Sequence, residues 1–436
     1  MNFKVTKIRD NPPALKHAKF KFNWKIIALL TLTLVLGITV AAKFKFFGPL
    51  PKRFLSFSTL KKDNFGHTNI LLLGVAGHAE EGGNLSDAMM ILSLNSALPS
   101  ISILNLPRDL FISSAIGDRK INEIYAAARY KHGDRKGLEI VEKAVAMFTN
   151  LDIHYSIVVD FSVFSEAIDL IGGINIYVPK EIIDPFYPAD NYQFQSFIVR
   201  KGLQHFDGET ALKYARSRKT SSDYDRAERQ QDLFLAIKQK IESISLAQNL
   251  AKIQEIYNLF RTKVNTDIGL SEIVSLVKVS IGIDFGSIVM SVLNDDPTRK
   301  GGFLYAPARE FYDGQFVLLP YDLRDTQEFI SLILKTPKTL LENAQLSILN
   351  ASKINGAAKK LAARLKRMGF HIINIGNFDS PVPLPRTIIK KNSNSSTSLS
   401  INFLKKLLSA KIIENKNISP TNSNELIDLE IIVGVN

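Results

Sequence analysis

The sequence predicts an α/β protein in which helices cover both faces of a central sheet, forming an α-β-α sandwich. Short apolar runs bounded by turn residues recur along residues 67–241, and stretches with helical spacing lie between them. Strands that alternate with helices are typical of sheets covered on both faces. A shorter alternation of the same kind follows residue 337, which indicates a separate small C-terminal α/β domain.

An uncharged apolar run of 17 residues at 26–42 comes first along the chain. It reaches the lower end of the roughly 17–25 residues that cross a bilayer as a helix. Because Lys43 directly follows the last two alanines of the run, no clear cleavage site is present, and we expect an uncleaved transmembrane helix. A buried core helix or a cleavable signal peptide is the alternative.

Basic residues flank this run on both sides, seven before it and six after it. The positive-inside rule therefore favours a cytoplasmic N-terminus by only one charge. We expect a single-pass protein of the cell membrane. Residues 1–25 would form a basic cytoplasmic tail, 43–66 an extracytoplasmic stalk, and all later domains would lie outside the cell.

The main folded domain is expected at 67–337. Its expected strands are 69–73, 89–94, 101–106, 157–159 and 174–178, and its expected helices are 137–150, 162–170 and 226–241. Residues 242–337 begin with helical spacing and end in short strands at 303–305 and 316–319, without a motif that indicates a function.

The C-terminal domain is expected at 338–436. Its expected elements are strand 346–349, helix 357–368, strand 371–375, helix 401–408 and strand 429–433. A low-complexity patch of serine and asparagine at 392–399 interrupts this pattern.

Composition and charge exclude several functions. The chain of 436 residues is 45% hydrophobic and contains no cysteine, which excludes disulfides, thiolate zinc sites and a cysteine nucleophile. The formal charge of +13 divides into +12 for residues 1–62, −7 for 63–337 and +8 for 338–436. Because the largest part is acidic, we do not expect a nucleic-acid partner. The charge around the apolar run suits anionic lipid headgroups instead.

Three short segments concentrate polar side chains. Asp87 stands at the entry of an apolar strand, and Arg108 with Asp109 follows another strand. The third segment, 214–231, holds four arginines together with carboxylates and glutamines. Arginine binds phosphate oxygens bidentately and keeps its charge at physiological pH. Several arginines, with carboxylates that hold a divalent cation, are therefore suited to a pyrophosphate ester.

Spacing within the third segment favours a shared ligand. Arg216 and Arg218 would lie on one face of an extended segment, and Arg226, Arg229 and Gln230 on one face of a helix. A helix that begins near Arg226 would also offer free N–H groups to an anion. The alternative is a solvated helix face held by ordinary ion pairs. For the other two segments the alternatives are a strand-edge carboxylate and a turn with a helix cap.

These segments, in this order, resemble the LytR–CpsA–Psr family of membrane-anchored phosphotransferases, which attach glycopolymers to bacterial peptidoglycan. Seven separated blocks within 69–231 carry the resemblance. They are NILLLG (69–74), Ser86-Asp87, Pro107-Arg108-Asp109, Lys120-x-Asn122, LIGGI (170–174), 202–218 with YARSR, and 223–231 with DxxRxxRQQ. The segments Leu349-Asn350-Ala351 and Gly369-Phe370 resemble the C-terminal domain often appended to LytR-type proteins.

The resemblance implies a fold, a substrate and a site. The central sheet would be mixed, and the donor would be a glycopolymer on a polyprenyl-pyrophosphate carrier, with its lipid in an apolar tunnel. The glycosyl phosphate would pass to a hydroxyl of peptidoglycan. The cofactor would be Mg²⁺, with Mn²⁺ as the alternative. No histidine or serine nucleophile is needed, because phosphoryl transfer depends mostly on positioning and charge neutralisation.

Carried over position by position, the resemblance also implies residue roles. Substrate binding falls to Arg108, Lys120, Arg216, Arg218, Arg226, Arg229 and Gln230. The catalytic set is Arg108, Arg216, Arg218 and Asp223, with Asp223 as a supporting or proton-accepting carboxylate. Asp87 would contact the metal.

The chain departs from the family pattern at Ala76. The family usually has a second metal-binding aspartate there, and alanine cannot act as a ligand. His78, Glu80 or Glu81 in the following loop, or a water molecule, could take its place, and a hard cation would prefer the glutamates.

Two other functions remain open at this point. A hydrolase could use the same arginines with water as the acceptor and release the polymer from its lipid. A non-catalytic regulator could bind polyprenyl phosphates without turnover, which the alanine at position 76 makes conceivable.

Overall fold

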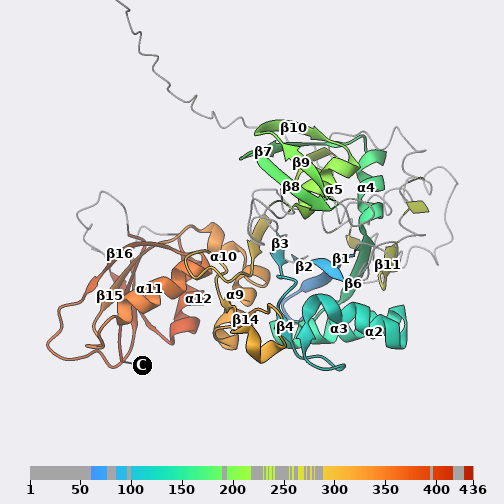
Figure 1. Cartoon of the computed structure of the whole chain (residues 1–436). Helices are drawn as coiled ribbons and strands as arrows, with labels where there is room; N and C mark the ends of the chain where they lie inside the picture. Colours follow the sequence, from blue (N-terminus) through green and yellow to red (C-terminus); the bar gives the residue numbers. More distant parts are fainter. Residues whose placement is uncertain are drawn as a thin grey trace, which may run out of the picture.

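The computed structural model describes most of the chain after residue 59 (Figure 1). The described residues are 60–75, 85–95, 100–188, 194–217, 288–392, 396–415 and 427–435, with 264–269 and scattered positions between 229 and 279. The predicted tail, transmembrane run and most of the stalk lie outside these ranges. Within them, no helix is both long and apolar enough to cross a membrane.

A six-stranded mixed sheet forms the centre of the main domain, in the order β11-β6-β1-β2-β3-β12. Its strands are β1 (His67–Val75), β2 (Ser86–Asn95), β3 (Ser100–Asn105), β6 (Tyr155–Asp160), β11 (Val264–Thr266) and β12 (Ile288–Val292). β1 pairs with β6 in parallel and with β2 antiparallel, and β3 pairs with β12 in parallel. The mixed sheet predicted from the resemblance is therefore confirmed.

Alternating side chains of this sheet enter two separate hydrophobic cores. Leu71 and Leu73 of β1 pack with α2 (Ile121–His132) and α3 (Asp134–Thr149). Ile70 and Leu72 face the other side, where Val163 of α4 (Phe161–Leu170) is buried. This period-2 alternation gives a helical layer on both faces, so the predicted α-β-α sandwich is confirmed.

A β-ribbon, made of residues 174–188 and 194–206, extends the main domain on the side of α4. Its strands are β7 (Ile174–Val178), β8 (Ile182–Pro188), β9 (Phe194–Val199) and β10 (Gly202–Phe206), paired antiparallel as β7 with β10 and β8 with β9. In Figure 1 the ribbon, in green, lies on one side of the sheet, and α2 and α3 lie on the other.

The helix α5 (Gly208–Arg216) follows the ribbon directly and crosses α4 at close range. Asp207 caps it, since its carboxylate accepts a hydrogen bond from the Thr210 amide at 2.8 Å. A Cβ on Gly208 would collide with the backbone of Ser165 in α4, so this crossing requires glycine. The helix thereby delivers Arg216, its last residue, to the sheet.

The C-terminal domain is a five-stranded sheet in the order β16-β15-β19-β17-β18, with two helices. Its elements are β15 (Gln345–Asn350), α11 (Ala357–Met368), β16 (His371–Asn377), β17 (Ile388–Asn392), α12 (Ser398–Leu408), β18 (Lys411–Asn415) and β19 (Leu429–Val433). All five predicted elements are present, and β17 and β18 are additional.

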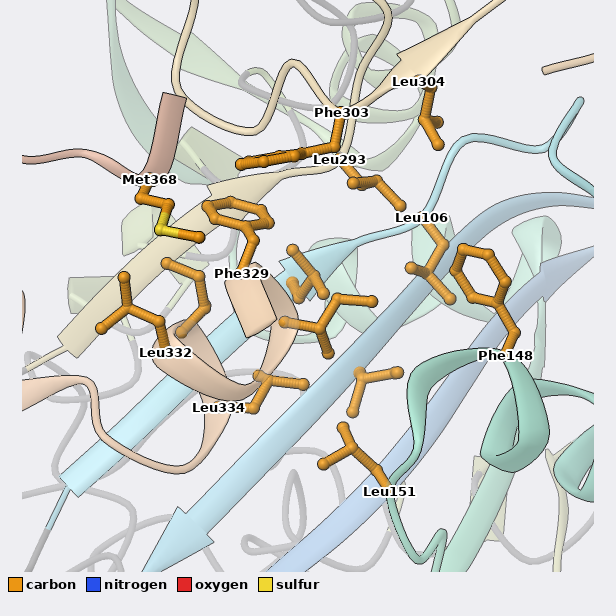
Figure 2. Packing of buried hydrophobic residues seen from close by; sticks show 14 of the residues in the cluster. Leu106, Phe148, Leu151, Leu293, Phe303, Leu304, Phe329, Leu332, Leu334 and Met368 are labelled. Carbon is orange, nitrogen blue, oxygen red and sulfur yellow. The ribbon is translucent and has the colours of Figure 1, made fainter. Parts of the chain in front are cut away.

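One continuous core joins the two domains through α9 (Leu323–Leu334), which is followed by the short helix α10 (Lys338–Leu341). Phe329 of α9 stacks on Phe303 at 5.0 Å between ring centroids. Figure 2 shows Met368 of α11 beside both rings. The predicted division after residue 337 falls between α9 and α10.

Several short elements complete the main domain. They are β4 (Phe111–Ile112), β5 (Arg119–Lys120), β13 (Leu304–Tyr305), the 3-10 helix at Arg309–Tyr312 and β14 (Leu319–Pro320). Helices α2 and α5 and strands β4, β5 and β8 to β12 were not predicted. Helix α9 was also missed, because residues 242–337 were expected to end in short strands. In the predicted helix 226–241, the described residues in helical conformation are 229, 232–233, 235–237 and 239–240.

Candidate active site

The carboxyl ends of the parallel strands meet at one edge of the central sheet. The last residue of β1, Val75, pairs with Ser86 at the start of β2 and with Asp160 at the end of β6. The last residue of β3, Asn105, pairs with Val292 at the end of β12. Ligands of open α/β sheets commonly bind outside this edge. We refer to it as the carboxyl edge.

Four charged side chains form a connected network at the carboxyl edge. Nη1 of Arg108 lies 2.8 Å from Oδ1 of Asp87, and Nε of Arg108 lies 3.4 Å from Oδ2 of Asp109. Nζ of Lys120 lies 3.0 Å from Oδ1 of Asp109. The side chain of Asp109 is 10% exposed, whereas those of Asp87 and Arg108 are 27% and 22% exposed. Arg108 and Asp87 can therefore still reach a ligand. The more buried Asp109 holds the side chains of Arg108 and Lys120 in place.

Local backbone bonds fix this arrangement. The turn after β3 closes with a bond from the Leu110 amide to the Pro107 carbonyl at 3.1 Å. The first amide of α2, that of Ile121, donates to the Leu110 carbonyl at 2.7 Å. Phe111 of β4 pairs with Lys120 of β5, which brings the lysine back beside Asp109. The turn and the start of α2 are thus one unit.

Arg216 reaches the same edge from α5. Its guanidinium carbon lies 5.0 Å from the centroid of the Phe161 ring, and Phe161 is the first residue of α4, directly after β6. A Cβ placed on Gly74 would lie 3.1 Å from both the Phe161 ring and Cβ of Ala88, the residue after Asp87. Arg216 thus contacts Phe161, and Phe161 lies beside Gly74 and Ala88. This chain of neighbours places Arg216 at the ends of β1 and β6, on the edge that holds Asp87 and Arg108.

Arg229 is the other described arginine of the predicted set, and it is buried at 6% exposure. Its Nε donates to the Tyr214 carbonyl at 2.9 Å, and its Nη2 donates to the Ser217 carbonyl. Tyr214 lies in the last turn of α5, and Ser217 is the C-cap residue that follows it. The guanidinium therefore secures the helix end that presents Arg216, and direct contact of Arg229 with substrate stays a prediction.

The Tyr214 phenol is excluded as a general base. It is 1% exposed, and burial, with the nearby Asp232, raises its pKa to about 12. The phenol stays protonated at any physiological pH and belongs to the core under α5, where it packs on Phe206 at 5.2 Å.

Seven of the predicted site residues lie outside the described residues. They are the substrate-binding and catalytic residues Arg218, Asp223, Arg226 and Gln230 and the alternative metal ligands His78, Glu80 and Glu81. Their roles remain predictions.

The residues present suit a metal that takes most of its ligands from substrate and water. Among the described residues, no three His, Cys, Asp or Glu side chains gather closely enough to hold a metal ion. Asp87 offers one partly exposed carboxylate at the carboxyl edge. Mg²⁺ commonly binds through one or two carboxylates together with phosphate oxygens and water, so this donor set is adequate for Mg²⁺ only when phosphate is bound.

Three residues at the site had no role assigned from the sequence, although two of them, Asp109 and Asn122, stand in the matching blocks. Asp109 bridges Arg108 and Lys120, and Phe161 supports Arg216. The side chain of Asn122 is buried, and its Oδ1 lacks a hydrogen-bond partner among the described residues. The backbone N–H of Asn122 donates to the Arg108 carbonyl at 3.3 Å. The sequence thus indicated Asp109 as a motif residue but not its bridging position between Arg108 and Lys120.

The geometry defines a class of protein: an α/β domain that collects arginines, a lysine and a carboxylate at one sheet edge, as suits a phosphate ester. The LytR_cpsA_psr family matches residues 51–307, and a domain described as LytR cell envelope-related transcriptional attenuator matches residues 343–435. The chain belongs to the LytR–CpsA–Psr family and carries a LytR-type C-terminal domain.

Characterised relatives share part of their length with this chain. The polyisoprenyl-teichoic acid–peptidoglycan teichoic acid transferase TagV of Bacillus subtilis is 30% identical over 241 residues, which are 54% of this chain and 58% of TagV. A transferase of the same description, TagU of Oceanobacillus iheyensis, is 28% identical over 56% of this chain and 72% of its own. The chain thus spans under two thirds of TagV and somewhat more of TagU.

Solved structures of related proteins also match. Crystalline B. subtilis TagV is 24% identical, and the match covers 62% of this chain and 98% of that one with a TM-score of 0.47. A structure of TagT bound to LIIa-WTA is 20% identical, covering 63% of this chain and 94% of that one with a TM-score of 0.44.

Proposed function

We propose that the chain is a membrane-anchored extracytoplasmic phosphotransferase, which moves a glycopolymer from a polyprenyl-pyrophosphate carrier onto peptidoglycan or a similar envelope acceptor. One observation carries this proposal: Arg108, paired with Asp87, and Arg216, resting on Phe161, occupy the same edge of the sheet. Family membership and the transferase activity named for the relatives support the same function.

The chemistry requires two tasks of the site residues. Arg108 and Arg216 bind pyrophosphate oxygens and offset the charge that moves onto the departing polyprenyl phosphate. The acceptor hydroxyl oxygen bonds to the phosphorus nearer the sugar, and the bond from that phosphorus to the bridging oxygen breaks. Asp223 is proposed to accept the hydroxyl proton. A bound Mg²⁺ ion would supply further charge neutralisation, with Asp87 as its protein ligand.

The location of the reaction forms part of the proposal. We propose that residues 26–42 anchor the chain and that both folded domains lie outside the cell, where peptidoglycan is accessible. Protease accessibility in intact cells tests this directly: digestion of the domains without lysis supports it, and protection until lysis contradicts it.

An in-vitro reaction distinguishes the three functions that the residues allow. The chain is incubated with a lipid-linked sugar pyrophosphate, Mg²⁺ and a peptidoglycan oligomer. Polymer bound covalently to the oligomer supports the transferase. Free polymer would instead indicate the hydrolase, and unchanged donor that copurifies with the chain would indicate a non-catalytic binder.

A further inference from the structure

The two sheets of the ribbon are segments of one long hairpin. β7 ends at Val178 and β8 begins at Ile182, while β9 ends at Val199 and β10 begins at Gly202. Val178 pairs with Gly202, and Ile182 pairs with Val199. Three residues on one strand thus face two on the other, which is a β-bulge between paired segments. The ribbon therefore has one inner and one outer face along its length.

The inner face of the ribbon is an ordinary hydrophobic core. Alternate residues of all four strands are buried there and pack with α4 and α5. They are Ile174, Ile176, Val178, Ile182, Tyr187, Phe197, Val199 and Phe206. Strand alternation then predicts that the residues between them point outward, where a soluble domain normally places polar side chains.

The outer face carries one polar pair, His205 and Asn175, whose Nδ1 and Oδ1 atoms lie 2.8 Å apart, and is otherwise largely apolar. Tyr177 pairs with Leu203 across the ribbon, and these side chains are 62% and 72% exposed. Ile183 pairs with Ile198 in the next segment, also exposed. Phe186 and Phe194 form a third exposed contact, edge to face, with 6.0 Å between ring centroids. Six large apolar side chains on one face exceed what scattered surface residues account for.

Exposed basic residues lie in the middle of the ribbon, where its two paired segments join. Lys180, Arg200 and Lys201 occupy the bulge between the Tyr177–Leu203 pair and the Ile183–Ile198 pair. All three are exposed, and Glu181 is the one acidic residue beside them. None of the three is in an ion pair with any residue that the structure describes. This local positive charge stands out because residues 63–337 together carry −7. Aromatic, aliphatic and basic side chains on one face are typical of segments that lie at an anionic bilayer surface.

The ribbon is also connected to the carboxyl edge. Asp184, buried in β8, accepts a hydrogen bond at 3.0 Å from the hydroxyl of Ser217, the residue after Arg216. Figure 1 shows the ribbon at the side of the main domain opposite α2 and α3, away from the C-terminal sheet. Its outer face is therefore in position to meet a flat surface while the inner face supports the end of α5.

We propose that the outer face of the ribbon docks on the surface of an anionic lipid bilayer and so holds the arginine-rich edge at the level of lipid phosphates. The proposal rests on the proposed function in one respect, since a lipid-linked donor requires the domain to work at a bilayer. It identifies a surface of this chain that contacts the headgroup region, separate from any tunnel for the donor's lipid.

Spin labelling of the full chain tests the proposal. Because the sequence lacks cysteine, Ile198→Cys gives a single labelling site on the ribbon, and Met147→Cys gives a matched exposed site on α3. The labelled chains are reconstituted in vesicles of phosphatidylcholine and phosphatidylglycerol in equal parts. Collision with lipid-soluble oxygen and with a water-soluble nickel complex reports the depth of each label. Leu203→Cys provides a second ribbon site if the first variant folds poorly.

The expected result is a label at position 198 about 5–10 Å below the phosphates, the depth of interfacial segments, with the label at position 147 in water. Changing Lys180, Arg200 and Lys201 together to glutamate should move the ribbon label out into water. Equal exposure of both labels to the nickel complex would overturn the proposal. So would shielding of position 198 in detergent micelles that depends on protein concentration, which would indicate a second copy.

This measurement needs no turnover. A chain that docks but fails to transfer polymer would refute the proposed function and leave the docking surface intact. A chain that transfers polymer while its ribbon label remains in water on the vesicles would refute the docking surface alone.

Discussion

Substituting Asp109 tests the ion-pair network of the carboxyl edge most sharply. Asp109→Asn keeps the shape of the side chain but removes the charge between Lys120 at 3.0 Å and Arg108 at 3.4 Å. Breaking a buried pair by removing one partner costs about 3–5 kcal/mol, whereas exposed pairs are worth about 0–1 kcal/mol. With Asp109 and Lys120 at 10% and 17% exposure, we expect a loss of about 2–3 kcal/mol in the free energy of unfolding.

Urea unfolding at pH 7, followed by far-UV circular dichroism, measures this loss. Glu139→Gln is the matched control, because it removes the same charge from an ion pair with Lys136 at 2.8 Å whose side chains are 40% and 55% exposed. The control should unfold at the same urea concentration as the unmodified chain. Turnover of Asp109→Asn should also fall about ten- to a hundredfold, because Arg108 and Lys120 lose their common anchor.

Two results would contradict a joint role of Asp109 in stability and turnover. If Asp109→Asn unfolded at the same urea concentration as Glu139→Gln, the network would contribute nothing to stability. If the variant lost stability but turned over normally well below its melting temperature, the network would be structural and separate from the chemistry.

The remaining predictions concern single residues and the metal. Arg216→Lys should lower turnover at least about a hundredfold with an unchanged melting temperature, because lysine keeps the charge but lacks the planar fork; a large drop in melting temperature would indicate a structural role. Arg229→Gln should lower both the free energy of unfolding, by about 2–4 kcal/mol, and turnover, since two carbonyls at the end of α5 lose a buried donor; an unchanged urea midpoint would contradict this. Burial lowers the pKa of Lys300 from 10.5 to about 8, so the folded chain releases this proton first and stability rises with pH between about 8 and 10.5. Lys300→Met should therefore stabilise the chain by up to about 3 kcal/mol at pH 7, with a gain that disappears near pH 11, as urea unfolding at both pH values would show. Removal of Mg²⁺ with a chelator should stop transfer, and Asp87→Asn should raise the Mg²⁺ concentration required for half-maximal rate; full activity without a divalent cation would refute the metal.

Elements with a simple apolar pattern were predictable from the sequence. The continuous apolar run NILLL predicts β1, which is buried on both faces, and helical spacing predicts α3, α11 and α12, because burial of one helix face produces a regular period. Strands β8 and β9 were not predicted because they lack such a pattern. Ile183, Phe186, Phe194 and Ile198 place apolar side chains on the exposed face, so the period-2 contrast disappears.

The candidate site was predictable in part. Chemistry and resemblance indicated Asp87, Arg108 and Arg216, and the antiparallel register of β1, β2 and β3 explains why the first two meet. The bridging role of Asp109 depends on Lys120, which a pair of two-residue strands returns to it, and strands this short leave no periodic signal. Arg229 was assigned to an accessible helix face, and its burial at the end of α5 depends on tertiary packing.

The proposed transfer reaction tests most directly whether the carboxyl edge is the active site of a transferase. The chain is combined with a lipid-linked sugar pyrophosphate, Mg²⁺ and a peptidoglycan oligomer. Free lipid is then removed, and the products are separated by mass. We predict that the unmodified chain forms a phosphodiester between the sugar and the oligomer. The Arg216→Ala variant should form none. Intact donor after prolonged incubation, or equal product with Arg216→Ala, would contradict the assignment of the carboxyl edge as the active site.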